Sequence, residues 1–362
     1  MRKNILISTT RQWNPGDEFI MHGVLNAINC AFGNCLNPII FNRNPDVRGG
    51  GKWRSKTRNA EWTYRWEKKY FRGKGILTEL FRLGHWDNSF KDDMDPNCID
   101  VAIFAGSPEW FSRRLSSMYR AIDIANIPTV FLGLGAGDQT DFSSTMPIVK
   151  HVLEKARLIT CRDRATTTLL ESFGAKFLPC PALLSTKTNR HVTEVKRIGL
   201  IYATDHTVLG NHVSPQMHKY ILGLYAYLAS KYDVALVCHY VDEIELAQKD
   251  FPGMDVFYSY DSKDYAEIYN HFDLVIGGRV HGIGMCASLG IPGIMIKHDT
   301  RSDTTDGFLA DYVQIGMSYE SVDNIIQANI QNISNQSLKL IEHKANVMNQ
   351  YVRLLRNVLN FE

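Results

Sequence analysis

Short apolar strands alternate with amphipathic helices along this chain, and that alternation limits the fold more than any other feature. It predicts parallel sheets whose faces are covered by helices. Helices are expected from residue 17 onward and at 265–272 and 283–289. Strands are expected at 4–8, 100–105, 129–133, 158–161, 197–202, 234–238, 274–276 and 292–296.

A polar stretch near residue 190 divides the alternation into two parts, and a length of 362 residues suits two domains. We predict two doubly wound Rossmann-like α/β domains facing a cleft, the default ligand site of such folds. The N-terminal domain would span 1–190 with an insertion at 42–95, and the C-terminal domain 191–330. A helix within 331–362 would pack back across both domains.

Composition excludes several classes of protein. Hydrophobic residues make up 44% and charged residues 22%, as in ordinary globular chains. No apolar run approaches the roughly 18 residues that a membrane span needs. The seven cysteines include no Cys-x-x-Cys pair, so we expect neither disulfides nor a zinc site, and no cofactor. The apolar start is too short for a secretory signal, which predicts a cytoplasmic protein.

Residues 42–74 form a basic, aromatic segment. They carry eleven basic and three acidic residues, although the net charge of the whole chain is only +2. One interpretation is a solvated insertion. The other is a surface for the phosphates of a lipid-linked or polymeric acceptor, or for the inner membrane face. Nucleic acid is not expected, because no known binding module accompanies the segment.

The most informative motif runs from Asp273 to Gly282. A buried strand leads into two glycines, then Arg279 and His281, immediately before a helix. The free N–H groups of a helix start and a guanidinium together favour a bound phosphate or carboxylate. His281 is the group in this motif that can transfer a proton near neutral pH, with a pKa lowered by Arg279 and raised by a bound dianion. The alternative is a capping Arg and a structural His.

This motif, followed by Gly290-Ile291-Pro292, resembles the C-terminal signature of the polysaccharide pyruvyl transferase family. The resemblance extends over roughly residues 1–40 and 95–315, and the basic segment lies outside it. It includes three further stretches: Asn14-Pro15-Gly16-Asp17, the glycine-rich run from Phe131 to Gly137, and Ile159 to Arg164.

The resemblance implies a GT-B-like fold and transfer of a pyruvyl group from phosphoenolpyruvate to two hydroxyls of a sugar. Arg162 and Arg279 would bind the donor, and His281 would protonate it. Asp17 would orient or deprotonate the acceptor hydroxyl, unless it only caps a helix. Further substrate-binding candidates are Asn14, Gly16, Gly135 and Arg301.

The chain departs from the family pattern at Ala105 to Trp110 and at Pro179-Cys180-Pro181, which leaves the acceptor open. One alternative function is a GT-B glycosyltransferase that uses a nucleotide sugar, because the same helix start would bind a diphosphate. Another is a non-catalytic binding module. His239 and His298 follow strands and are weaker candidates for substrate contact.

Overall fold

The structure is a computed structural model that describes residues 2–9, 15–42, 95–106, 115–137, 141, 143, 145–205, 213–359 and 361. Asn14 and residues 43–94, which include nearly all of the basic segment, lie outside the described residues. The predictions made for them remain predictions.

The first half of the chain forms a six-stranded parallel sheet in the order β2-β1-β3-β4-β5-β6. Its strands are β1 (Lys3–Thr9), β2 (Leu36–Asn42), β3 (Val101–Ala105), β4 (Thr129–Leu134), β5 (Leu158–Cys161) and β6 (Lys176–Phe177). Its helices are α1 (Pro15–Phe32), α6 (Ser116–Ile124), α7 (Pro147–Glu154) and α8 (Arg164–Leu169), with short 3-10 turns at Gly33–Cys35, Pro96–Cys98, Glu171–Phe173 and Pro181–Leu184.

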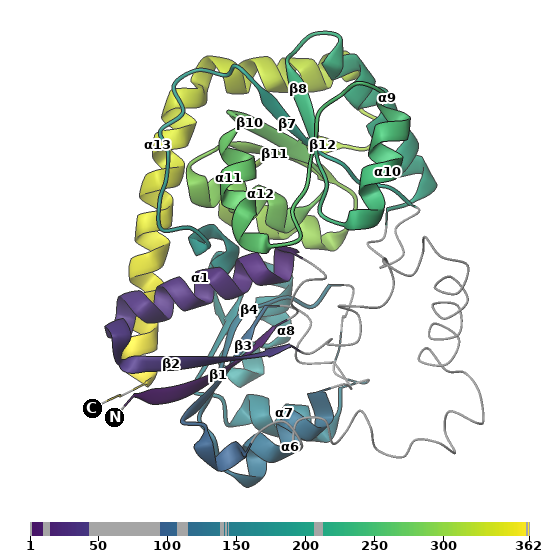
Figure 1. The fold of residues 1–362 in the computed structure, drawn as a ribbon. Coiled ribbons are helices and arrows are strands. Elements are labelled where there is room, and N and C mark those ends of the chain that lie inside the picture. Colours follow the sequence, from purple (N-terminus) through teal and green to yellow (C-terminus); the bar gives the residue numbers. More distant parts are fainter. Residues whose placement is uncertain are drawn as a thin grey trace, which may run out of the picture.

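The second half forms another six-stranded parallel sheet, in the order β12-β11-β10-β7-β8-β9 (Figure 1). Its strands are β7 (Ile198–Ile201), β8 (Val234–Val237), β9 (Val256–Phe257), β10 (Leu274–Gly277), β11 (Gly293–Lys297) and β12 (Asp311–Gln314). Its helices are α9 (Pro215–Ala229), α10 (Val241–Asp250), α11 (Tyr265–Asn270) and α12 (Val280–Leu289), with 3-10 turns at Ser262–Asp264 and Thr300–Phe308.

Both sheets reverse their strand order at one point, between β1 and β3 in the first and between β7 and β10 in the second. Ligands of doubly wound folds bind at the carboxyl ends of the strands beside such a reversal. The predicted fold of two doubly wound Rossmann-like halves is confirmed.

All eight predicted strands are present, with ends that differ by at most one residue. The sequence analysis missed β2, β6, β9 and β12. Each is an edge strand of its sheet. β6 and β9 have only two residues, and β2 contains Pro38, which lacks a donor for a ladder. Edge strands bury fewer side chains, so their apolar signal is weak.

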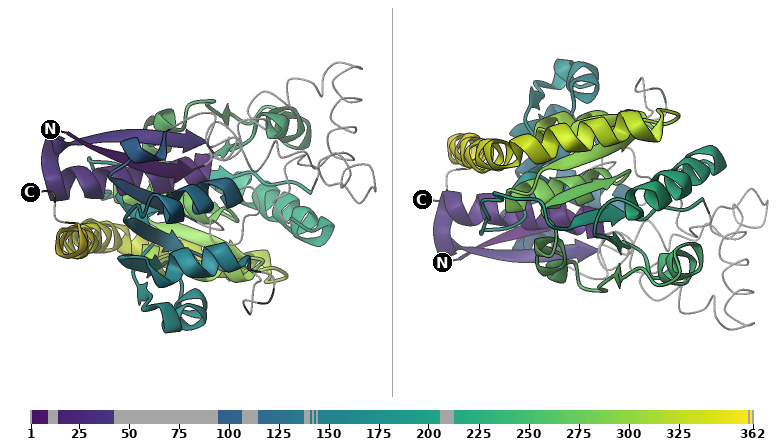
Figure 2. Two further views of the ribbon diagram at one scale, coloured as in Figure 1. Left: turned by 90° about the horizontal axis from the view of Figure 1, so that it is seen from below. Right: turned by 90° about the horizontal axis from the view of Figure 1, so that it is seen from above.

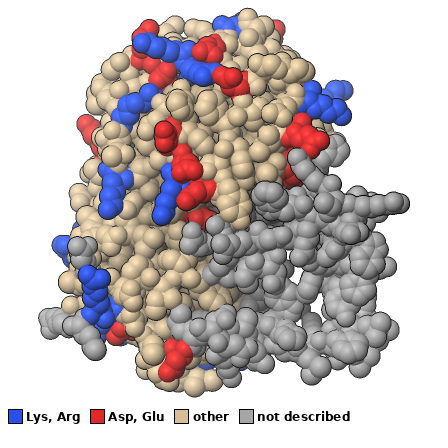
Figure 3. Space-filling model, in the orientation of Figure 1, with Lys and Arg blue, Asp and Glu red and all other residues tan. Residues whose placement is uncertain are grey.

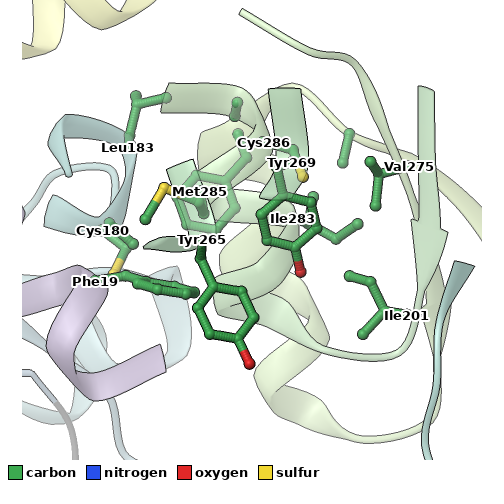
Figure 4. Close-up of a cluster of buried hydrophobic side chains, with 14 of the residues drawn as sticks. Phe19, Cys180, Leu183, Ile201, Tyr265, Tyr269, Val275, Ile283, Met285 and Cys286 are labelled. Atoms are coloured by element: carbon green, nitrogen blue, oxygen red, sulfur yellow. The ribbon is translucent and has the colours of Figure 1, made fainter. Parts of the chain in front are cut away.

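Side chains of β1 alternate between two cores. Ile5 and Ile7 point into a core that continues through the second half, whereas Leu6 points into a smaller core with α6 and α7. The larger core crosses from one half to the other: in Figure 4, Phe19 and Cys180 of the first half lie beside Tyr265 of the second. The Phe19 and Tyr265 rings meet edge to face, with centroids 5.6 Å apart. Apolar burial therefore fixes how the halves face each other.

The chain ends with a long helix, α13 (Tyr319–Val358), which begins earlier than the predicted 331. It runs along one side of both halves (Figures 1 and 2). Lys344 Nζ donates to the Ser288 carbonyl in the second half at 2.6 Å, and Arg356 Nε donates to the Ala31 carbonyl in the first at 2.9 Å. We propose that the domain boundaries lie at residues 190 and 330.

Candidate active site

The candidate residues follow the carboxyl ends of strands in both sheets. Gly135 follows β4, Arg162 follows β5, Arg279 follows β10 and Arg301 follows β11. Because parallel strands end at one edge of a sheet, side chains from distant parts of the sequence meet there. The two edges face each other closely enough that Thr300 Oγ1 donates to the Gly137 carbonyl at 3.2 Å.

Arg162 is 3% exposed and connects the two halves. Its Nη1 lies 3.0 Å from His281 Nε2, although the residues are 119 positions apart in sequence. The guanidinium also donates a hydrogen bond to the Cys180 thiol, whose pKa burial raises. No carboxylate among the described residues pairs with Arg162, and its Nε has no hydrogen-bond partner among them. Both partners that the described residues supply are thus neutral.

Gly135 allows Arg162 to occupy this position. A Cβ added at Gly135 would lie 2.6 Å from Arg162 Nε and 2.9 Å from its Cζ. Real Cβ contacts are not this short. The predicted close approach at the end of β4 is therefore an approach to the guanidinium, and any side chain at residue 135 would displace it.

Arg279 is the N-cap residue of α12 and is 7% exposed. Its Nη2 forms an ion pair with Glu243, which is fully buried, and its guanidinium carbon lies 4.4 Å from the Tyr240 ring centroid. Glu243 also accepts the backbone N–H of His239 at 2.8 Å and of Tyr240 at 3.0 Å. Arg279 therefore has a counterion, but its Nε and Nη1 have no hydrogen-bond partner among the described residues.

His281 lies in the first turn of α12 and is partly buried. Burial lowers its pKa well below the ordinary value, and Arg162, Arg301 and His239 lower it further. The cations that act on the ring are thus Arg162 and Arg301, and Arg279, to which the sequence analysis attributed the effect, is not among them. The ring is neutral near pH 7.

Arg301 approaches the same place from the turn after β11. Its Nε donates to Asp299 Oδ2 at 2.7 Å, and its backbone N–H donates to Asp299 Oδ1 at 3.0 Å. Like Arg279, it has a carboxylate partner. Of the three candidate arginines, Arg162 alone has no counterion among the described residues.

Asp17 lies in the first turn of α1 and is 8% exposed. It is the third residue of α1, which begins at Pro15, and therefore not the N-cap residue itself. Its charge helps to raise the pKa of both Cys180 and Tyr240, so the carboxylate lies on the side of the partners of Arg162 and of Arg279. Gly16 precedes it in the same buried turn.

Glu243 was not among the candidates from the sequence, and His239 was one of the weaker ones. His239 is 4% exposed, and its Nε2 lies 2.7 Å from the Tyr269 hydroxyl, beneath Gly282. Burial and Arg279 lower its pKa well below the usual range. An acidic residue three positions after Tyr240 is a helix-start pattern that could have drawn attention to Glu243. His298 is farther from the centre, and its Nδ1 lies 3.2 Å from the Ile296 carbonyl.

Two searches of the described residues gave negative results. They contain no group of three or more His, Cys, Asp or Glu side chains placed to bind a metal ion. None of their helices is long and apolar enough to cross a membrane.

Solved structures show which class of fold this is. Staphylococcus aureus MnaA in a co-structure with UDP aligns at 15% identity and a TM-score of 0.59, covering 99% of this chain and 98% of that one. UDP-GlcNAc 2-epimerase from Neisseria meningitidis, bound to UDP-GlcNAc, aligns at 12% identity and a TM-score of 0.56, covering 99% and 100%. The chain therefore has the GT-B fold, as predicted.

A comparison with family models identifies the family. The model described as polysaccharide pyruvyl transferase matches residues 14–300, the bulk of the chain. The chain belongs to the polysaccharide pyruvyl transferase family and is a transferase. A search of curated proteins gave no match.

Proposed function

We propose that this protein transfers the pyruvyl group of phosphoenolpyruvate to a sugar of a cell-surface polysaccharide or of its lipid-linked precursor, forming a cyclic ketal. Family membership supports a polysaccharide acceptor. The observation that carries the donor assignment is Arg162, a buried guanidinium in contact with His281 for which the described part of the chain supplies no counterion. Burying an uncompensated charge costs free energy, which an incoming anion recovers.

The donor is a small molecule with a phosphate and a carboxylate attached to the same carbon atom. Arg162 can bind one of these anions, and the free Nε and Nη1 of Arg279 can bind the other. The N–H groups that begin α12 lie beside Arg279 and favour the same negative charge. Glu243 and Asp299 would orient Arg279 and Arg301 without contacting the donor themselves.

In the reaction, His281 gives a proton to the methylene carbon of the donor, and the neighbouring carbon becomes an oxocarbenium-like centre. A sugar hydroxyl attacks that carbon and loses its proton. Inorganic phosphate then leaves as a second hydroxyl closes the ring. Over the whole cycle, one hydroxyl proton ends on the new methyl group and the other on phosphate, so that His281 returns to its starting state. General acid catalysis of this kind contributes on the order of 10²–10⁴-fold.

The acceptor would bind on the side of α1. Asp17 is the candidate base for its hydroxyl, with Gly16 and Asn14 beside it in the chain. On the face drawn in Figure 3, acidic and basic side chains of the described residues are interspersed. The basic segment 42–74 is therefore the candidate surface for a lipid-linked acceptor or for the cytoplasmic face of the inner membrane.

A second candidate function is transfer of a sugar from a nucleotide sugar. The solved structures that share the fold contain UDP or UDP-GlcNAc, and a helix start with Arg279 suits a diphosphate as well. Thermal-shift measurements with phosphoenolpyruvate and with UDP, GDP and CMP sugars separate the two functions. The proposed function predicts stabilisation by phosphoenolpyruvate, whereas the alternative predicts stabilisation by one of the nucleotide sugars.

The test of the reaction combines phosphate release with analysis of the saccharide. We expect the protein to release phosphate from phosphoenolpyruvate only with a suitable polysaccharide or lipid-linked acceptor, and the product to gain a carboxyethylidene group. His281→Gln should abolish both signals while phosphoenolpyruvate still binds. If His281→Gln kept more than about a tenth of wild-type kcat, His281 would not be the acid.

A further inference from the structure

The contact between Arg162 and His281 determines which nitrogen of the imidazole carries a proton. Arg162 Nη1 lies 3.0 Å from His281 Nε2. A guanidinium only donates hydrogen bonds and stays charged in proteins. The Nε2 atom must therefore be the acceptor, with no proton of its own. The neutral ring carries its proton on Nδ1.

The other charged and titratable groups around the ring act in the same direction. Arg162 faces it from the end of β5, Arg301 from the turn after β11 and His239 from the end of β8. Arg279 precedes it on α12, in an ion pair with Glu243. Asp299 is paired with Arg301, and Asp17 on α1 acts on Cys180 but is not among the groups that shift the pKa of His281. Among the described residues no carboxylate pairs with His281, so the surrounding protein groups oppose an imidazolium.

In this state His281 is unsuited to the role of an acid. Its Nε2 has no proton to give, and a proton could not be added there without breaking the hydrogen bond from Arg162. An anion bound to Arg162 changes both conditions. It accepts the N–H groups of the guanidinium, and its negative charge favours a protonated ring nearby.

We propose that Arg162 keeps His281 Nε2 unprotonated until an anion binds and then gives up His281 Nε2, so that anion binding itself supplies the acid with its proton. Arg162 is thus a donor-binding residue and also a positioning residue for His281. The inference rests on the proposed function only for the identity of the natural anion. Any dianion that occupies Arg162 should have the same effect.

Cys180 is part of this arrangement. Its thiol is fully buried, accepts a hydrogen bond from Arg162 and has a pKa raised by burial, so that it stays neutral. A neutral partner positions the guanidinium without cancelling its charge. Cys180→Asp would supply a counterion and should weaken the binding of inorganic sulfate at least tenfold, whereas Cys180→Ser should leave it within about threefold of wild type.

Nitrogen-15 NMR of labelled histidine rings tests the proposal directly, with His281→Gln to assign the signal. At pH 7 the empty protein should show His281 as the neutral form protonated on Nδ1. Saturating sulfate should convert it towards imidazolium, because the bound dianion raises the pKa of the ring. Arg162→Met should remove the dependence on sulfate, whereas Arg164→Met, an exposed arginine two residues along, should retain it.

Calorimetry of the unmodified protein gives a second test that does not depend on any variant folding. Sulfate does not titrate between pH 6 and 8, so proton uptake measured in buffers of different ionisation heat comes from the protein. The proposal predicts uptake of up to about one proton per bound sulfate. Two results would overturn the proposal. One is a His281 ring that is protonated on Nε2 in the protein without an anion, and the other is a ring that responds to neither sulfate nor phosphoenolpyruvate. If His281 responds but no pyruvyl transfer is found with any acceptor, the proposed function fails and this inference stands.

Discussion

Gly135→Ala tests whether the position of Arg162 controls donor binding. The added Cβ would lie 2.6 Å from Arg162 Nε, 2.8 Å from its Nη2 and 2.9 Å from its Cζ. All three atoms belong to a guanidinium that is 3% exposed, so it cannot swing into water. To reach an ordinary contact distance the group must move by about 1 Å. A shift of that size would disrupt its 3.0 Å hydrogen bond to His281.

The magnitude follows from what is lost. The displaced guanidinium should lose about one hydrogen bond to the bound donor; a hydrogen bond to a charged group contributes about 1.5–3 kcal/mol, so phosphoenolpyruvate binding should weaken by about 10- to 150-fold. Crowding of the site should also lower the free energy of unfolding by about 1–3 kcal/mol. Calorimetric titration with phosphoenolpyruvate measures the first effect, and urea denaturation measures the second.

Gly174→Ala is the matched control. Gly174 has a φ of +72° and nothing within 4 Å of the added Cβ, so the substitution strains the backbone without touching another group. It should cost about 1 kcal/mol of stability and leave donor binding unchanged. If Gly135→Ala bound phosphoenolpyruvate within about twofold of wild type, the placement of Arg162 would not determine donor affinity and the reasoning would be refuted.

Three further outcomes are expected. Glu243→Gln removes the carboxylate that pairs with buried Arg279 and should lower the free energy of unfolding in urea by about 3–5 kcal/mol. Glu245→Gln, at an exposed residue of the same helix, should change it by less than about 0.5 kcal/mol. Equal effects of the two substitutions would show that the ion pair is unimportant. His239 and His281 have lowered pKa values, so the unfolded chain binds more protons below its ordinary histidine pKa of about 6.5. The free energy of unfolding in urea should therefore decrease as the pH is lowered from 7.5 to 5.5, by about 1.4 kcal/mol per histidine. A constant or rising stability would contradict the neutral assignment. Replacing Arg54, Lys56 and Arg58 of the 42–74 segment with Ser should weaken acceptor or liposome binding at low salt and leave phosphoenolpyruvate binding unchanged. Wild-type behaviour in both assays would mean that the acceptor binds elsewhere.

The sequence was most informative where strands end at turns. Arg162 and His281 were predicted to lie in one site, and they are in contact across 119 residues. The order of the elements places each residue at the carboxyl edge of its own sheet, whereas their assignment to one site came from the resemblance to the family. Arg301 was a candidate through the same resemblance, and its charge acts on the His281 ring.

The sequence could not predict which carboxylates pair with the candidate arginines. Glu243 pairs with Arg279 from another helix, and nothing in the spacing of acidic residues identifies which carboxylate will reach a given guanidinium. The consequence is chemical, since the pairing leaves Arg162 as the candidate arginine without a counterion among the described residues. Protonation was equally hidden, because the neutral state of His281 depends on burial and on a hydrogen bond between two halves of the chain.

Calorimetric titration of phosphoenolpyruvate into wild type, Arg162→Met and Arg164→Met tests the central claim most directly, with UDP-GlcNAc titrated in parallel. We predict that wild type and Arg164→Met bind phosphoenolpyruvate equally and that Arg162→Met binds it at least about tenfold more weakly. UDP-GlcNAc should neither bind measurably nor displace phosphoenolpyruvate. Equal phosphoenolpyruvate affinity in wild type and Arg162→Met, or tight binding of UDP-GlcNAc alone, would contradict the account.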